Sequence, residues 1–173
     1  MGRILFIVFI MALVAFKLCS DRTSSDTSGI APITPTATTT HNAITTGSTP
    51  YANAHTGENN NAKINICTTS ASECDVVVII KQGKSIVRNT YIAAGDIATI
   101  YVPNGEYRVY YYCGKGWDAE KPMPGNRKGG FAHAETFGAE APVSLNYDTR
   151  TFSITPTASG CSAALRASLR DIF

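Results

Sequence analysis

The chain has 173 residues, enough for about one folded domain, and 44% of them are hydrophobic. Its formal net charge is +2, with both signs interspersed, so it lacks the dense basic footprint of a nucleic-acid-binding protein. Composition and charge therefore give no reason to expect a nucleic-acid partner, and the organisation along the chain carries most of the information.

An unbroken apolar run, residues 4–16 (ILFIVFIMALVAF), lies near the start of the sequence. Arg3 precedes it and Lys17 follows it. A bilayer-spanning helix needs about 20 apolar residues, whereas a positive start with a shorter apolar centre is typical of a secretory signal peptide. We therefore expect residues 1–20 to be a signal peptide, with an uncleaved membrane anchor as the alternative.

Cys19 offers a third fate for this segment. The sequence FKLCS loosely resembles the site at which bacterial lipoproteins receive a lipid on a cysteine thiol, although Leu18 stands where such sites carry a small residue. Every alternative places the rest of the chain outside the cytoplasm. We expect an exported protein of the cell envelope or the extracellular space, which contacts the membrane through its N-terminal segment if that segment is uncleaved or lipidated.

Residues 21–62 are rich in Ser, Thr, Asn, Ala and Pro and contain few large apolar side chains. They show neither helical nor alternating periodicity. Such a stretch cannot bury enough surface to offset the entropy lost on ordering. We therefore expect a disordered linker between the N-terminal segment and a folded domain at 63–173.

Short alternating or apolar runs, separated by turn residues, begin at Lys63 and are typical of an all-β domain. The expected strands are 63–68, 75–81, 85–92, 96–102, 106–113, 131–137, 143–147 and 150–155. The second of these is apolar on both faces, which predicts a buried central strand. The apolar residues of 162–173 fall near one helical face and predict a short C-terminal helix.

Two connections in this domain have distinct turn chemistry. The sequence Pro103-Asn104-Gly105 predicts a hairpin between 96–102 and 106–113, since Asn-Gly is the strongest short turn signal. The following segment 114–130 (GKGWDAEKPMPGNRKGG) contains several glycines and two prolines, which predicts an irregular loop. Long loops in compact domains are often functional.

Four of the five cysteines follow Cys19. In an exported chain an even number favours disulfides, although four cysteines permit three pairings. Cys67 and Cys74 flank a short connection between two predicted strands and are candidates for a bridge across a hairpin base, which leaves Cys113 for Cys161. Zinc is the rival interpretation, but no CxxC spacing is present, and we expect no metal and no cofactor. If Cys19 is retained without a lipid, an intermolecular bridge becomes an alternative.

The stretch 94–114 (AGDIATIYVPNGEYRVYYYCG) resembles the strand, Pro-x-Gly turn and x-Tyr-x-Val strand of carboxypeptidase-regulatory-like and transthyretin-like modules. Over 67–173, the runs DVVVII, SIVRNTYI and YYYCGKGWD also resemble a family of uncharacterised exported proteins from Bacteroidetes-type bacteria. These resemblances imply an antiparallel β-sandwich of transthyretin-like or immunoglobulin-like type, and an exported location. They imply no activity, and Cys113 within the tyrosine segment departs from the family pattern.

Alternation in the strand 106–113 places Val109 and Cys113 on one face together with Tyr107 and Tyr111, and we expect that face to be core. The opposite face and the following segment supply the candidate ligand-binding residues, which are Arg108, Tyr110, Tyr112, Lys115, Trp117, Asp118, Arg127 and Lys128. Two interpretations are open for the outward tyrosines. Either the loop and the C-terminal helix cover them, or they form an exposed aromatic platform suited to sugar rings or a peptide.

Catalytic and metal-binding patterns are missing from the sequence. His133 and Glu135 share a strand face, but a metal needs further ligands and no third is evident. There is no GxSxG, HExxH or P-loop pattern, so no catalytic residue is predicted. We therefore expect a non-catalytic interaction module that binds a protein or a cell-surface glycan through the segment after the tyrosine strand. The alternatives are a structural component of a surface assembly and a small envelope enzyme.

Overall fold

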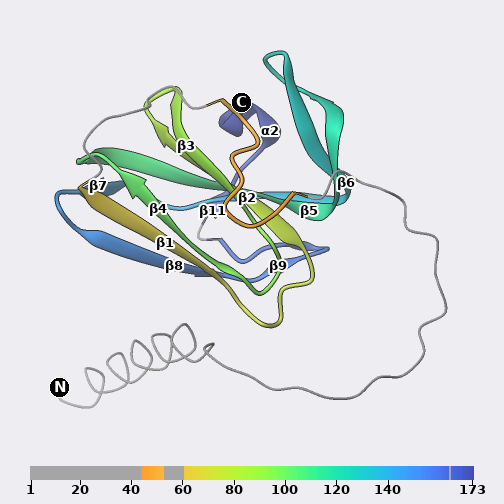
Figure 1. The fold of residues 1–173 in the computed structure, drawn as a ribbon, viewed down its shortest axis with the longest axis horizontal. Coiled ribbons are helices and arrows are strands. Elements are labelled where there is room, and N and C mark those ends of the chain that lie inside the picture. The colour runs from red at the N-terminus through yellow and green to blue at the C-terminus, as the bar shows by residue number, and fades with distance from the viewer. Residues whose placement is uncertain (1–43, 53–60, 164) are drawn as a thin grey trace. The chain divides into compact units, whose positions relative to one another are not determined.

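The computed structural model describes residues 44–52, 61–163 and 165–173. The predictions for segment 1–20, including lipidation at Cys19, lie outside these residues, as does most of the predicted linker 21–62. Figure 1 shows the described part as β-sheets with a short helix close to the C-terminus. No helix in the described ranges has the length and apolarity needed to cross a bilayer.

The strands are β1 Ala62–Thr68, β2 Asp75–Gln82, β3 Ser85–Ile92, β4 Ile97–Val102, β5 Gly105–Met123, β6 Arg127–Ala139, β7 Val143–Leu145, β8 Thr149–Ile154, β9 Pro156–Thr157, β10 Gly160–Cys161 and β11 Leu165–Arg166, and the helix is α2 Leu169–Ile172.

Most of these strands belong to two sheets. A three-stranded sheet has the order β4-β1-β8, in which β1 pairs antiparallel with β4 and parallel with β8. A six-stranded antiparallel sheet has the order β11-β6-β5-β2-β3, with β7 added beside the start of β5. β9 and β10 form a small ribbon of two strands. The prediction of a mostly antiparallel β domain with a short C-terminal helix is confirmed.

Side-chain alternation along β2 and β5 divides the interior into two hydrophobic clusters. The inner core contains residues of both sheets, with Ile64, Ile66, Val78, Tyr107, Val109 and Tyr111 among its members. The outer cluster lies on the other face of the six-stranded sheet and includes Tyr51, Val77, Ile79, Tyr91, Tyr110, Tyr112, Trp117, Phe131 and Ile172. The predicted division of the tyrosines between two faces is confirmed. β2 is the buried central strand, because β3 and β5 flank it on both sides.

The predicted hairpin at Pro103-Asn104-Gly105 is wrong. β4 pairs with β1 in one sheet and β5 pairs with β2 in the other, so the connection carries the chain between sheets. Neither Asn104 nor Gly105 adopts the positive φ that a two-residue type I′ turn requires. Instead, the Tyr107 hydroxyl donates to Pro103 O at 2.7 Å, and Tyr147 N donates to Asn104 Oδ1 at 2.8 Å.

The predicted irregular loop 114–130 is also wrong. β5 continues to Met123 and pairs with β6 up to that last residue, so the segment forms a long hairpin that extends beyond the rest of the sheet (Figure 1). We call residues 115–131 the arm. Two register shifts in the β5–β6 ladder absorb the irregular residues, and Gly116 supplies a positive φ of 66° close to the first. Glycine here permits a bulge and does not end the strand.

The C-terminal helix is shorter than the predicted range 162–173. Leu165 and Arg166 pair with β6 as strand β11, which removes the first half of that range from a helix. The helix then begins after Ser168, whose backbone N–H and hydroxyl both donate to the Asp171 carboxylate. Ile172 is fully buried in the outer cluster and Leu169 packs against that cluster, whereas Leu165, which was expected on the same helical face, lies in β11 and is 42% exposed.

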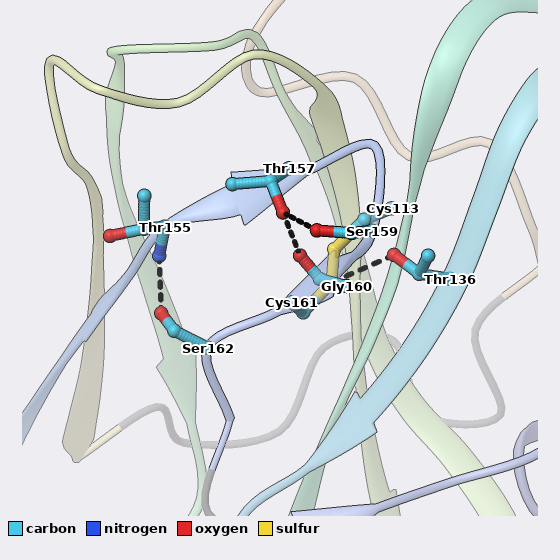
Figure 2. Close-up of a disulfide and its surroundings, with 8 residues drawn as sticks. All are labelled: Cys113, Thr136, Thr155, Thr157, Ser159, Gly160, Cys161 and Ser162. Atoms are coloured by element: carbon cyan, nitrogen blue, oxygen red, sulfur yellow. Dashed lines mark hydrogen bonds between the residues drawn. A yellow bond between two sulfur atoms is a disulfide. The ribbon is translucent and has the colours of Figure 1, made fainter.

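The predicted Cys113–Cys161 disulfide is present and fastens β5 to β10 (Figure 2). The Thr136 hydroxyl lies 3.6 Å from the Cys161 sulfur. The predicted Cys67–Cys74 bridge is wrong, because Cys74 is a buried free thiol whose pKa burial raises. Cys67 lies in β1 of one sheet and Cys74 precedes β2 of the other, so the connection between them forms no hairpin base.

Candidate functional site

The outward tyrosines of β5 are covered. Tyr110 is 8% exposed and Tyr112 is fully buried. Phe137 stacks on the Tyr112 ring with centroids 5.1 Å apart, and Phe131 packs against the same ring with centroids 5.0 Å apart. These rings therefore form no exposed platform. Residues of β6 and residues around α2 pack over this face of the sheet.

Trp117 anchors the arm to the outer cluster. Its side chain is 8% exposed and meets Phe131 at 5.3 Å, Tyr91 at 6.0 Å and Tyr51 at 6.3 Å between ring centroids. Gly129 lies against the indole with a φ of 102°, and a Cβ at that position would stand 2.6 Å from the indole Cζ2. Glycine is required here for both reasons.

A polar network joins the arm to the sheet. The Tyr112 hydroxyl donates to the Glu135 carboxylate and accepts from Phe131 N at 2.8 Å. Lys121 Nζ lies 2.7 Å from the other Glu135 oxygen and donates to Phe131 O at 2.5 Å. Burial, and then the bond to Glu135, raise the pKa of Tyr112. The network satisfies polar groups that would otherwise be buried without partners.

Residues 44–52, which we call the strap, lie against the six-stranded sheet (orange in Figure 1). Tyr51 is 4% exposed and belongs to the outer cluster. Its backbone N–H donates to Asn89 Oδ1 at 3.0 Å, and its hydroxyl donates to Gly129 O at 2.9 Å. The strap falls within the predicted linker 21–62 but differs from that prediction, because one buried aromatic and several hydrogen bonds fix it to the domain.

A shallow depression of about 320 Å³ lies between the strap and the arm. Its lining residues are Ile44, Ser48 and Pro50 from the strap and Trp117, Ala119, Lys128 and Gly129 from the arm. The surface is therefore a mixture of small apolar side chains, one indole and one cation. It is built jointly by two segments that are far apart in the sequence.

The structure brings two of the predicted site residues, Trp117 and Lys128, to this depression. Lys128 also pairs with Glu120 at 2.5 Å, and that hydrogen bond raises the pKa of Lys128. The other candidates lie elsewhere. Tyr110 and Tyr112 are buried, Arg108 lies over the Tyr110 ring, Lys115 is exposed, Asp118 accepts from Glu120 N, and Arg127 lies over the Phe173 ring.

The prediction from sequence missed Ile44, Ser48, Pro50 and Ala119. The first three lie in a stretch whose composition matches a linker. The available signal was the single aromatic Tyr51 directly after Pro50, which is unusual in a segment of Ser, Thr and Asn. An isolated aromatic in such a stretch marks a point at which a linker can dock.

The described ranges contain no group of three His, Cys, Asp or Glu side chains that could hold a metal ion. Comparison with protein-family models, with curated proteins and with solved structures finds no match to this chain. The depression between the strap and the arm is therefore the feature of the described residues that points to a function.

The buried tyrosines predict a loss of stability in alkali. The pKa values of Tyr51, Tyr91, Tyr111 and Tyr112 are all raised, with burial as the largest cause. The unfolded chain releases these protons above about pH 10, whereas the folded chain keeps them. Stability is therefore complete below about pH 10 and falls by about 1.4 kcal/mol per tyrosine for each further pH unit.

Urea denaturation at about pH 8 and about pH 11 measures this effect, since the transition shows the free energy of unfolding at each pH. Tyr91→Phe should reduce the alkaline loss, because one buried phenol is removed. Tyr147→Phe should leave it unchanged, since Tyr147 is 73% exposed. Equal losses for wild type and Tyr91→Phe would contradict the assignment.

Proposed function

We propose that this chain is an exported, non-catalytic interaction module whose sheets form a β-sandwich of the transthyretin-like class. The apolar run at 4–16 and the Cys113–Cys161 disulfide support an exported location. The partner is a protein, bound through the depression between the strap and the arm. The observation that carries this proposal is the depression itself, which Ile44, Pro50 and Ala119 line together with Trp117.

The exposure of Trp117 favours a protein over a glycan. A sugar stacks on an open aromatic face, but Trp117 is 8% exposed and its ring is surrounded by other aromatics. A lining of aliphatic side chains and one lysine instead suits an aliphatic side chain of a peptide segment. Surface regions of this kind, on a rigid β scaffold, commonly serve recognition.

Selection from a random peptide library on the immobilised full-length chain tests this proposal. Selected peptides should bind the wild type, and Ala119→Arg should weaken them at least about tenfold, because the new side chain fills the depression. Ala132→Arg is the matched control, since Ala132 is an exposed alanine of β6 in the same region of the sheet. It should leave the affinity within about twofold.

Two outcomes would sink the protein-binding proposal. One is that Ala119→Arg and Ala132→Arg weaken the selected peptides equally. The other is that a glycan array, and no peptide, retains the wild-type chain and loses it on Ala119→Arg. The second outcome would assign the same depression to a sugar.

A further inference from the structure

The strap binds to the edge of the six-stranded sheet in the way that an extended peptide ligand does. β3 is an edge strand of the six-stranded sheet. Gly47 N donates to Tyr91 O at 2.9 Å, and Tyr91 N donates to Ser48 O at 2.8 Å. These are main-chain hydrogen bonds between an extended segment and a sheet edge, which is a recurring mode of peptide recognition.

Asn89 fixes the register of the strap. Its side chain is 1% exposed and contacts both polar backbone groups of one residue, accepting from Tyr51 N at 3.0 Å and donating to Tyr51 O at 2.7 Å. If the strap left, this buried amide would lose both hydrogen-bond partners, which costs free energy. The site therefore favours an extended segment whose backbone lies where that of Tyr51 lies.

The Tyr51 side chain occupies a pocket of its own. Its ring meets the edge of Phe173 with centroids 4.9 Å apart and lies 6.3 Å from Trp117. Its hydroxyl donates to Gly129 O at 2.9 Å. One aromatic anchor in a closed pocket, beside main-chain bonds and a backbone clamp, is sufficient to specify a short extended peptide.

The other end of the strap is bound through the Thr46 side chain. The Thr46 hydroxyl donates to Asp96 Oδ2 at 2.6 Å and accepts from Ala93 N at 2.9 Å. These two contacts join residues at least 47 positions apart in the sequence, and the Tyr51–Asn89 contacts join residues 38 apart. The docking site is therefore independent of the local chain around the strap, and an identical segment from another molecule can make the same contacts.

We propose that the surface formed by the β3 edge, Asn89 and the arm is a binding site for the strap of a second copy of this chain, so that copies assemble by exchanging residues 44–52. Exchange of an identical element creates an interface without new contacts. The nine residues 53–61 can span at most about 30 Å when extended, which is comparable to the size of a small domain. This proposal goes beyond the partner-binding function and does not depend on it.

Protein concentration decides whether a chain binds its own strap or the strap of a second copy. Docking within one chain has an effective concentration in the millimolar range, so dilute chains keep their own straps. Two variants remove the competition from a chain's own strap: one cannot supply a strap, and the other cannot bind one. Tyr51→Ala leaves the acceptor site intact but removes the anchor of the strap, whereas Asn89→Ala leaves the strap intact but removes the clamp.

Mixing these two full-length variants tests the exchange. Each variant alone should be monomeric in native mass spectrometry, and the equimolar mixture should give a one-to-one heterodimer, since Tyr51→Ala can accept the strap that Asn89→Ala donates. The control is Tyr51→Ala mixed with the double variant Tyr51→Ala, Asn89→Ala, which lacks any intact strap and should stay monomeric. Ala132→Arg, at an exposed alanine of β6 outside the arm, should leave the heterodimer unaffected when added to both partners.

A second measurement covers the case in which Asn89→Ala does not fold. A fluorescent synthetic peptide of residues 44–52 should bind full-length Tyr51→Ala, and the same peptide with alanine in place of tyrosine should bind at least about tenfold more weakly. If folded Tyr51→Ala binds neither the peptide nor the donor chain, the site does not exist. Binding of the peptide without a heterodimer from two folded variants would overturn exchange between copies and assign the site to a segment of another protein.

Discussion

Replacing Cys113 and Cys161 together by serine is expected to lower the free energy of unfolding by about 4 kcal/mol. The bridge closes a loop across a sequence separation of 48 residues, and a cross-link of that span removes conformational entropy from the unfolded chain. The loss is large because the closed loop is long, and the entropy that a cross-link removes from the unfolded chain grows with loop length.

Urea unfolding followed by circular dichroism measures the loss for the double variant. Cys74→Ala is the matched control, since Cys74 is a buried cysteine without a bridge, and its replacement should cost about 1 kcal/mol. The role of the bridge would be contradicted if the double variant and the control lost the same free energy.

Strand positions and faces could be predicted from the sequence because they depend on local alternation. The run DVVVIIK is apolar on both faces, and β2 is indeed buried between two neighbours. The separation of Tyr111 from Tyr110 and Tyr112 follows from the two-residue period of a strand. These features need no knowledge of which strand lies beside which.

Pairing between strands could not be predicted in the same way. Asn104-Gly105 is a hairpin signal, but β4 and β5 each have a better partner in a different sheet. The glycines of 114–130 predicted a loop because glycine weakens a strand, yet the aromatic contacts of Trp117 and Phe131 stabilise the extended arm. Long-range packing outweighed local propensity in both cases.

The candidate site was predicted in part. Trp117 and Lys128 follow the tyrosine strand in the sequence, and both line the depression. The docking of the strap could not be predicted, because the composition of residues 21–62 is that of a linker. Tyr51 is an exception within that composition. The Tyr51–Asn89 contacts, the Thr46 contacts and the main-chain bonds to β3 together hold the strap, and none of them is visible without the fold.

Trp117→Ala is expected to lower the free energy of unfolding by about 3–5 kcal/mol, because it leaves a large cavity among buried rings. The cavity would lie between Tyr51, Tyr91 and Phe131, which come from the strap, β3 and β6. The loss should therefore spread to the strap. Hydrogen exchange should speed up at Gly47 N–H and Tyr51 N–H as well as in the arm, since those amides bond to β3 and Asn89 beside the indole.

Lys115→Ala is the matched control, because Lys115 belongs to the same arm and is exposed. It should change the free energy of unfolding by less than about 0.5 kcal/mol. If Trp117→Ala kept the stability of the wild type and lost only binding, the indole would serve a ligand and not the packing of the arm. If it lost stability while the strap amides stayed protected, the strap and the arm would be independent, because the shared cavity would then carry no coupling between them.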